Sequence, residues 1–146
     1  MRKKIPEFLA IILIINMIMM MSCKKEATPD YPELIGYWSG TTTQGNPVSF
    51  KIENKKGTLY ITNYNLLVTF GPGQSQTFQH TNTQGIVALT GLNFSIPLGN
   101  GGQGPAYING SFNYGPSVIT LTGAYVVYYP SSSVDVVTGS YTGYKY

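Results

Sequence analysis

The feature that most limits the fold is the alternation of apolar and polar residues that fills the chain after residue 34. Apolar side chains recur at every second position, and Gly, Pro, Asn or Ser residues interrupt them at short intervals. No window of a dozen residues keeps the spacing of an amphipathic helix, whereas a period of two is typical of strands with one buried face. The sequence therefore predicts an all-β domain.

A β-hairpin over residues 48–62 is the clearest local prediction. Apolar and polar residues alternate from Val48 onward, and the alternation resumes after a turn that ends in Gly57. Further strands are expected at residues 66–70, 77–81, 86–98, 106–114, 118–129 and 134–144, which with a first strand at residues 36–43 gives about eight. The glycine-rich stretch 99–105 is expected to be a flexible hairpin tip rather than a phosphate-binding loop, because no helix follows it.

Glycine recurs in the middle of predicted strands, with an aromatic residue two positions later. The pairs are Gly110 and Phe112, Gly123 and Tyr125, and Gly139 and Tyr141. A related segment at residues 90–94 also places Gly91 in mid-strand, but its aromatic residue comes three positions later. With a period of two, each glycine shares a face with its aromatic residue. We expect these positions to be sharp coils of the sheet, with an aromatic ring covering the backbone. Asn109-Gly110 could form a turn by itself, but the repeat favours a strand.

An antiparallel meander of this size either closes into a barrel or folds into a β-sandwich, and closure removes the unpaired edges. Gly36-Tyr37-Trp38 at the start of the first strand is similar to the Gly-x-Trp of lipocalins and avidin-like proteins. The Thr-Gly-x-Tyr strands resemble those of small lipocalin-like lipoproteins. The resemblance implies an up-and-down, calycin-type β-barrel over residues 35–146, in which Trp38 plugs one end; a β-sandwich is the alternative. It implies no particular ligand, since lipocalin signatures in later loops are missing and avidin-type biotin sites need several Trp where this chain has one.

The first 22 residues have the organisation of a signal peptide. Arg2, Lys3 and Lys4 precede an apolar run over residues 8–21, and a small residue, Ser22, closes the segment. A run of about 14 residues is shorter than the roughly 20 that a transmembrane helix needs. We therefore expect residues 1–22 to be removed.

Met20-Met21-Ser22-Cys23 resembles the lipobox of bacterial lipoprotein signal peptides, with Met20 where Leu is commoner. The resemblance implies that Cys23 becomes the mature N-terminus, carrying a diacylglyceryl thioether and an amine acylated by a fatty acid such as palmitate. Several acyl chains give a lasting membrane anchor. The alternative is an ordinary signal peptide followed by an incidental cysteine.

Residues 23–34 are expected to be a lipidated tether, because they are rich in charge and proline and carry almost nothing apolar that could dock on a core. The residues after Cys23 are Lys24 and Lys25, and the aspartate that would resemble an inner-membrane retention signal is absent there. The cell outer membrane is therefore the expected location. Its periplasmic face and the cell surface both stay open.

Charge and titratable residues exclude two classes of function. From Leu34 onward four lysines oppose only Glu53 and Asp135, so clustered cations for nucleic acid are missing. The same body contains one histidine, His80, and these two carboxylates, which are too few and too dispersed for acid–base catalysis or a metal site. The sequence predicts a protein that is not an enzyme and uses no cofactor or metal.

Binding is the remaining class of function. Twelve tyrosines supply large, wettable contact area, although tyrosine is also an ordinary strand residue. The preferred expectation is a small apolar or aromatic ligand within the barrel, bound by Trp38, Phe112, Tyr125 and Tyr141. The alternative is docking of another envelope macromolecule on an exposed Tyr-rich surface, with the protein partner unknown. A cavity reaching past Trp38 favours the first; a filled interior with an exposed aromatic patch favours the second.

Overall fold

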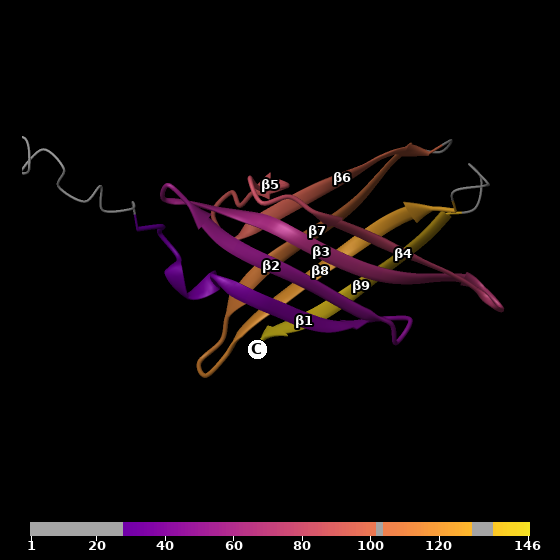
Figure 1. Ribbon diagram of the computed structural model, residues 1–146. Helices are drawn as coiled ribbons and strands as arrows, with labels where there is room; N and C mark the ends of the chain where they lie inside the picture. The colour runs from indigo at the N-terminus through magenta and orange to yellow at the C-terminus, as the bar shows by residue number, and fades with distance from the viewer. Residues whose placement is uncertain (1–27, 102–103, 130–135) are drawn as a thin grey trace, which may run out of the picture.

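The computed structural model describes residues 28–101, 104–129 and 136–146 (Figure 1). These residues form one short 3₁₀ helix and nine strands: η1 (Pro32–Leu34), β1 (Gly36–Thr42), β2 (Pro47–Lys55), β3 (Thr58–Gly71), β4 (Gln74–Thr81), β5 (Val87–Ala88), β6 (Asn93–Gly101), β7 (Gly104–Tyr114), β8 (Ile119–Tyr128) and β9 (Val136–Lys145). The predicted all-β class is confirmed.

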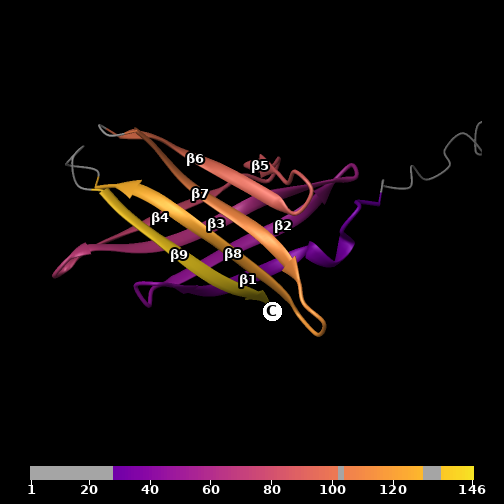
Figure 2. The ribbon, with the colours of Figure 1, turned by 180° about the vertical axis from the view of Figure 1, so that it is seen from behind.

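Eight strands form an antiparallel meander in the order β4-β3-β2-β1-β9-β8-β7-β6, with β5 added beside β3. The first strand pairs with the last along five residue pairs, from Trp38 and Lys145 to Thr42 and Tyr141. The single sheet curls strongly, so that β6 and β7 pass over β2 and β3 on the opposite side of the core (Figures 1 and 2). This is an open barrel of the lipocalin-like, up-and-down kind, as the sequence predicts.

The curl leaves a seam between the two edge strands. Within the part of the chain that the structure describes, β4 and β6 have no ladder pairing with each other. At one end of the seam β5 pairs with β3 through Tyr60–Ala88 and Ile61–Val87, and β5 also contacts β6. The barrel is therefore closed by β5 at one end and open between β4 and β6 at the other.

The predicted hairpin is confirmed as β2 and β3. Lys56 and Gly57 form its two-residue loop with φ of 56° and 91°, the left-handed conformation of the turn that suits a twisted hairpin. The side chain of Asn54 accepts a hydrogen bond of 2.8 Å from the Gly57 amide. The second strand runs on as one 14-residue element, where the sequence predicts two shorter strands. A register shift opposite Lys51 and Ile52 lets this long strand bend without ending.

Two predicted segments differ from the structure. The stretch 86–98 is not one strand, because Gly91 takes a φ of 59° in a turn that joins β5 to β6. Gly91 is therefore a turn residue, and its assignment to the mid-strand repeat is wrong. The sequence predicts a flexible hairpin tip over residues 99–105. In the structure the strands reach further into this stretch, because β6 extends to Gly101 and β7 begins at Gly104.

The three other repeat glycines lie inside strands, with their missing side chains toward the core. Register partners place Phe94 opposite Gly110, Tyr141 opposite Gly123 and Tyr125 opposite Gly139. The rings nearest to the three missing Cβ atoms come from these neighbouring strands. The sequence predicts that each glycine is covered by the aromatic residue two positions later on its own strand. That prediction is wrong, because the covering ring comes from the neighbouring strand.

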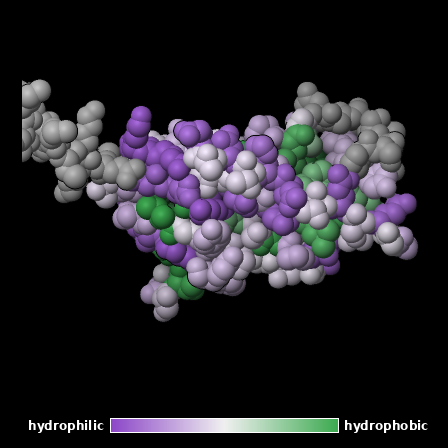
Figure 3. Space-filling model, viewed as in Figure 1, coloured by the Kyte–Doolittle hydropathy of each residue, from purple (hydrophilic) through white to green (hydrophobic). Residues whose placement is uncertain are grey.

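One hydrophobic cluster fills the curl and includes residues from η1 to β9. Trp38 has no exposed surface, and its indole nitrogen donates a hydrogen bond of 2.9 Å to the Leu34 carbonyl. The indole is therefore satisfied and buried at the end where the chain enters, as expected of a plug. On the face seen in Figure 3, hydrophobic surface is most evident beside the tip of the β6–β7 hairpin, amid hydrophilic and neutral residues.

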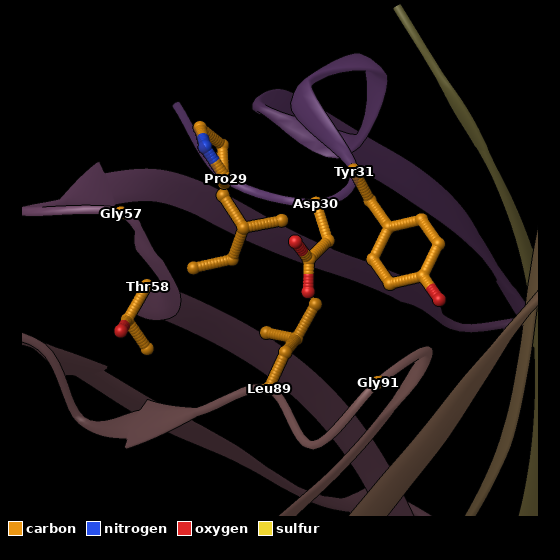
Figure 4. A pocket seen from close by; sticks show the side chains of 8 residues that line it. Pro29, Asp30, Tyr31, Gly57, Thr58, Leu89 and Gly91 are labelled. Atoms are coloured by element: carbon orange, nitrogen blue, oxygen red, sulfur yellow. The ribbon is translucent and has the colours of Figure 1, made fainter. Parts of the chain in front are cut away.

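The segment before β1 packs on the same end of the barrel. Pro29 is buried, and Leu34 has no exposed surface. Pro29, Asp30 and Tyr31 pass over Leu89 and Thr58, around a small pocket of about 200 Å³ (Figure 4). The expectation that the tether has almost nothing to dock on the core does not hold for residues 29–34.

Candidate functional site

The four predicted ligand-binding residues lie in the packed interior. Trp38, Phe112, Tyr125 and Tyr141 are at most 3% exposed. The Trp38 and Phe112 rings lie edge to face with centroids 4.8 Å apart. None of the described pockets is lined by any of the four. Ligand binding by these residues stays a prediction.

Two further aromatic residues complete this interior cluster. Phe50 lies 5.3 Å from Phe94 and 5.4 Å from Tyr141, measured between ring centroids. Phe94 in turn lies 6.1 Å from Phe112. Their alternation within predicted strands was the signal for an inward direction, but nothing in the spacing indicated that their rings would meet. The cluster fills the space that a ligand beside Trp38 would need.

A groove at the open seam is the candidate binding site that the sequence did not reveal. It encloses about 530 Å³ between β4 and β6. Its lining includes Tyr64 from β3, Phe78 and His80 from β4, Ile86, and Ile96 and Leu98 from β6. Because these residues come from separated strands, only the curl of the sheet brings them together.

The groove combines an apolar floor with polar groups at its mouth. Tyr64 is 7% exposed and Ile96 1% exposed, so both form part of the floor. Burial raises the pKa of the Tyr64 hydroxyl above its usual value, which keeps the ring neutral. Gln79 and His80 are exposed and line the same space. A groove with an apolar floor, a polar mouth and no Asp, Glu, Lys or Arg in its lining suits a small apolar or aromatic molecule.

Of the three titratable residues that the sequence offered for catalysis or metal binding, only His80 lines this groove among the described residues. Glu53 is held on β2 by Lys51 and Lys55, at N–O distances of 2.6 and 2.9 Å. Hydrogen bonds from the two lysines lower the pKa of Glu53. His80 lies on β4, and Asp135 falls outside the described residues. In residues 28–101, 104–129 and 136–146, no three His, Cys, Asp or Glu side chains gather as a metal site would require.

The predicted signal peptide, residues 1–22, and the predicted lipidation site Cys23 also lie outside the described residues. Among the residues that are described, no helix has the length and apolar character needed to cross a membrane. Comparison with known proteins gives no significant match to a family model, a curated protein or a solved structure.

Proposed function

We propose that this protein is a non-enzymatic lipoprotein of the bacterial cell envelope, anchored in the outer membrane through acyl chains on Cys23, that binds a small apolar or aromatic ligand. The binding site is the groove at the seam between β4 and β6. The anchor is supported by the lipobox-like residues before Cys23, and the ligand class by the chemistry of the groove.

The observation that carries the choice of site is the contrast between the interior and the seam. Side chains fill the space around Trp38, whereas the seam leaves about 530 Å³ beside Tyr64, Phe78 and Ile96. A ligand can enter this groove without unpacking the aromatic cluster. An eight-stranded barrel can be filled by side chains or hold one small ligand. Because side chains fill this interior, an opening in the wall is the simpler place for a ligand.

Fluorescence titration with N-phenyl-1-naphthylamine, an uncharged aromatic probe, tests this site. His80→Trp places a large ring in the groove, and Ser75→Trp places the same ring on the same strand outside the groove lining. We expect His80→Trp to weaken probe binding by about tenfold or more, equivalent to about 1.4 kcal/mol. Ser75→Trp is expected to bind the probe as the native protein does. Equal affinities of the two variants, or no binding by the native protein, would refute the groove as the site.

A second candidate function is docking through an exposed tyrosine surface. Of the six exposed large hydrophobic side chains in the described part of the chain, four are tyrosines. A filled interior together with exposed tyrosines at one end of the barrel is the combination expected for docking rather than for a ligand inside the barrel. It supports a contact surface that is separate from the groove.

A further inference from the structure

Exposed aromatic side chains gather at the end of the barrel where the chain enters. We call five residues the tyrosine rim: Tyr37 at 49% exposure, Tyr114 at 47%, Val118 at 50%, Tyr144 at 50% and Tyr146 at 76%. Among the described residues, Val136 at the start of β9 is the one other exposed large hydrophobic side chain. Five of the six exposed large hydrophobic side chains in the described part of the chain therefore lie at this end.

The strand order explains why these residues meet. β1 begins at this end, and β9 and β7 finish there, next to η1 (Figures 1 and 2). The rings of Tyr37 and Tyr146 have centroids 6.0 Å apart, and the amide of Tyr146 donates to the Tyr37 carbonyl at 3.1 Å. Val118 belongs to the turn that follows Tyr114, with the Gly115 amide donating to its carbonyl.

Contacts to the entering segment hold the rim in place. Tyr31 packs on Tyr114 with ring centroids 6.4 Å apart, and the Tyr114 hydroxyl donates to the Glu33 carboxylate. The Lys145 ammonium donates to the Glu33 carbonyl at 2.8 Å. Tyr114 is consequently held against the entering segment by a ring contact and a hydrogen bond.

The charged side chains of the described residues also lie toward the rim end of the barrel. The described charged side chains are Asp30, Glu33, Lys51, Glu53, Lys55, Lys56 and Lys145. They belong to the entering segment, to β2 and its hairpin turn, and to the end of β9. Lys51 lies 5.3 Å from the centroid of the Tyr37 ring, so this charge borders the rim directly. From Gly57 to Tyr144 the described residues carry no Asp, Glu, Lys or Arg.

The distance to Cys23 restricts which end can face a membrane. Cys23 stands five residues before Thr28, the first described residue. Five residues span at most about 18 Å even when fully extended. Pro29, the next residue, is buried against the barrel end and fixes the chain there (Figure 4). Cys23 is six residues from this fixed point, a span of at most about 22 Å. An acyl chain on Cys23 would therefore hold the rim end close to the bilayer.

We propose that the tyrosine rim lies on the membrane surface and orients the barrel with the opposite end, where β6 ends and β9 begins, away from the bilayer. This proposal rests on the lipidation of Cys23 in the proposed function. Tyrosine suits the membrane interface, because its ring enters the apolar boundary while its hydroxyl stays hydrated.

Quenching by brominated lipid tests the orientation in the mature lipidated protein. The protein is reconstituted in vesicles of phosphatidylethanolamine and phosphatidylglycerol with brominated acyl chains, after mass spectrometry of its N-terminus. Tyr144→Trp places a fluorophore on the rim, and Thr138→Trp places one on the same outer face of β9, six residues away. At about 3.4 Å per residue the two positions differ by about 20 Å along the strand. Emission of the native protein, which contains the buried Trp38, is subtracted.

We expect brominated lipid to quench most of the fluorescence of the tryptophan in Tyr144→Trp. The tryptophan in Thr138→Trp is expected to keep its fluorescence. An acylated N-terminus with no loss at position 144 would overturn the rim contact alone, and would indicate that the rim is free to dock another macromolecule. Equal loss at both positions would also overturn it, since the barrel would then have no preferred end. A protein without acyl groups would overturn both the anchor and the rim contact.

Discussion

The ring of Tyr141 lies across Gly123, its register partner on β8, in the space that a side chain at position 123 would need. The ring carbon Cζ and the hydroxyl oxygen of Tyr141 are each 2.5 Å from the position of an ideal Cβ on Gly123. The same hydroxyl donates a hydrogen bond of 2.6 Å to the carbonyl of Asn109 on the next strand. Gly123 thus allows one ring on β9 to lie across β8 and to reach the backbone of β7.

Gly123→Val is expected to destabilise the domain although valine is the better strand residue. The new side chain would collide with Tyr141 and with the Asn109 carbonyl, and overpacking of this kind costs about 1 to 3 kcal/mol or more. Denaturant unfolding of the native and variant proteins measures the difference.

A matched control for this prediction is Gly71→Val at the end of β3. The nearest atom to a Cβ there is 3.9 Å away, and φ at Gly71 is not in the left-handed region. We expect little change in its free energy of unfolding. A neutral or stabilising effect of Gly123→Val would show that the close approach of Tyr141 is not needed for the curl.

Trp38→Ala is expected to destabilise the domain by about 3 to 5 kcal/mol, because the indole is completely buried against Phe112. The neighbouring change Ser39→Ala, at an exposed outward position, should stay within about 0.5 kcal/mol. Denaturation midpoints measure both, and emission of the native protein should lie at the short wavelength of a buried indole. Red-shifted native emission would contradict the burial.

Alternation in the sequence predicts which side chains point inward but not which of them meet. The β2–β3 hairpin and the burial of Trp38 could be predicted because both depend on local residues, and the structure confirms both. The ring that covers each glycine depends on the register between strands, which a single strand does not specify. Sequence reasoning accordingly paired Gly123 with Tyr125, whereas the structure pairs it with Tyr141.

The seam groove and the docked entry segment have no periodic signal at all. Tyr64, Phe78 and Ile96 are ordinary inward positions of three strands, and only the missing pairing between β4 and β6 turns them into a groove. Pro29 and Leu34 are isolated apolar residues in a polar segment, where composition indicates free chain. Both features are products of tertiary packing.

Cys23→Ala is expected to leave an uncleaved precursor without an acyl label, because the thiol is the acceptor of the diacylglyceryl group in the proposed lipidation. Cells fed a palmitate analogue, followed by immunoprecipitation, give the measurement. Ser22→Ala is the control, since alanine is also a small residue before the cysteine and should allow labelling. Equal labelling of Cys23→Ala and the native protein would refute lipidation at this position.

The stability of the domain is expected to fall with rising pH above about 10, and Tyr141→Phe should reduce the slope. Burial raises the pKa of the Tyr141 hydroxyl well above its usual value of 10.0, so the unfolded chain releases this proton before the folded chain does. The contribution is complete below the unfolded pKa and is lost as pH rises above it. Each such group changes the free energy of unfolding by about 1.4 kcal/mol per pH unit in that range. Tyr64 and Tyr125, whose pKa values burial also raises, add to the slope in both proteins.

At neutral pH Tyr141→Phe should cost about 1 to 3 kcal/mol, since the Asn109 carbonyl loses its donor. Urea unfolding at a series of pH values separates the two effects, and identical slopes for both proteins would show that Tyr141 ionises without unfolding.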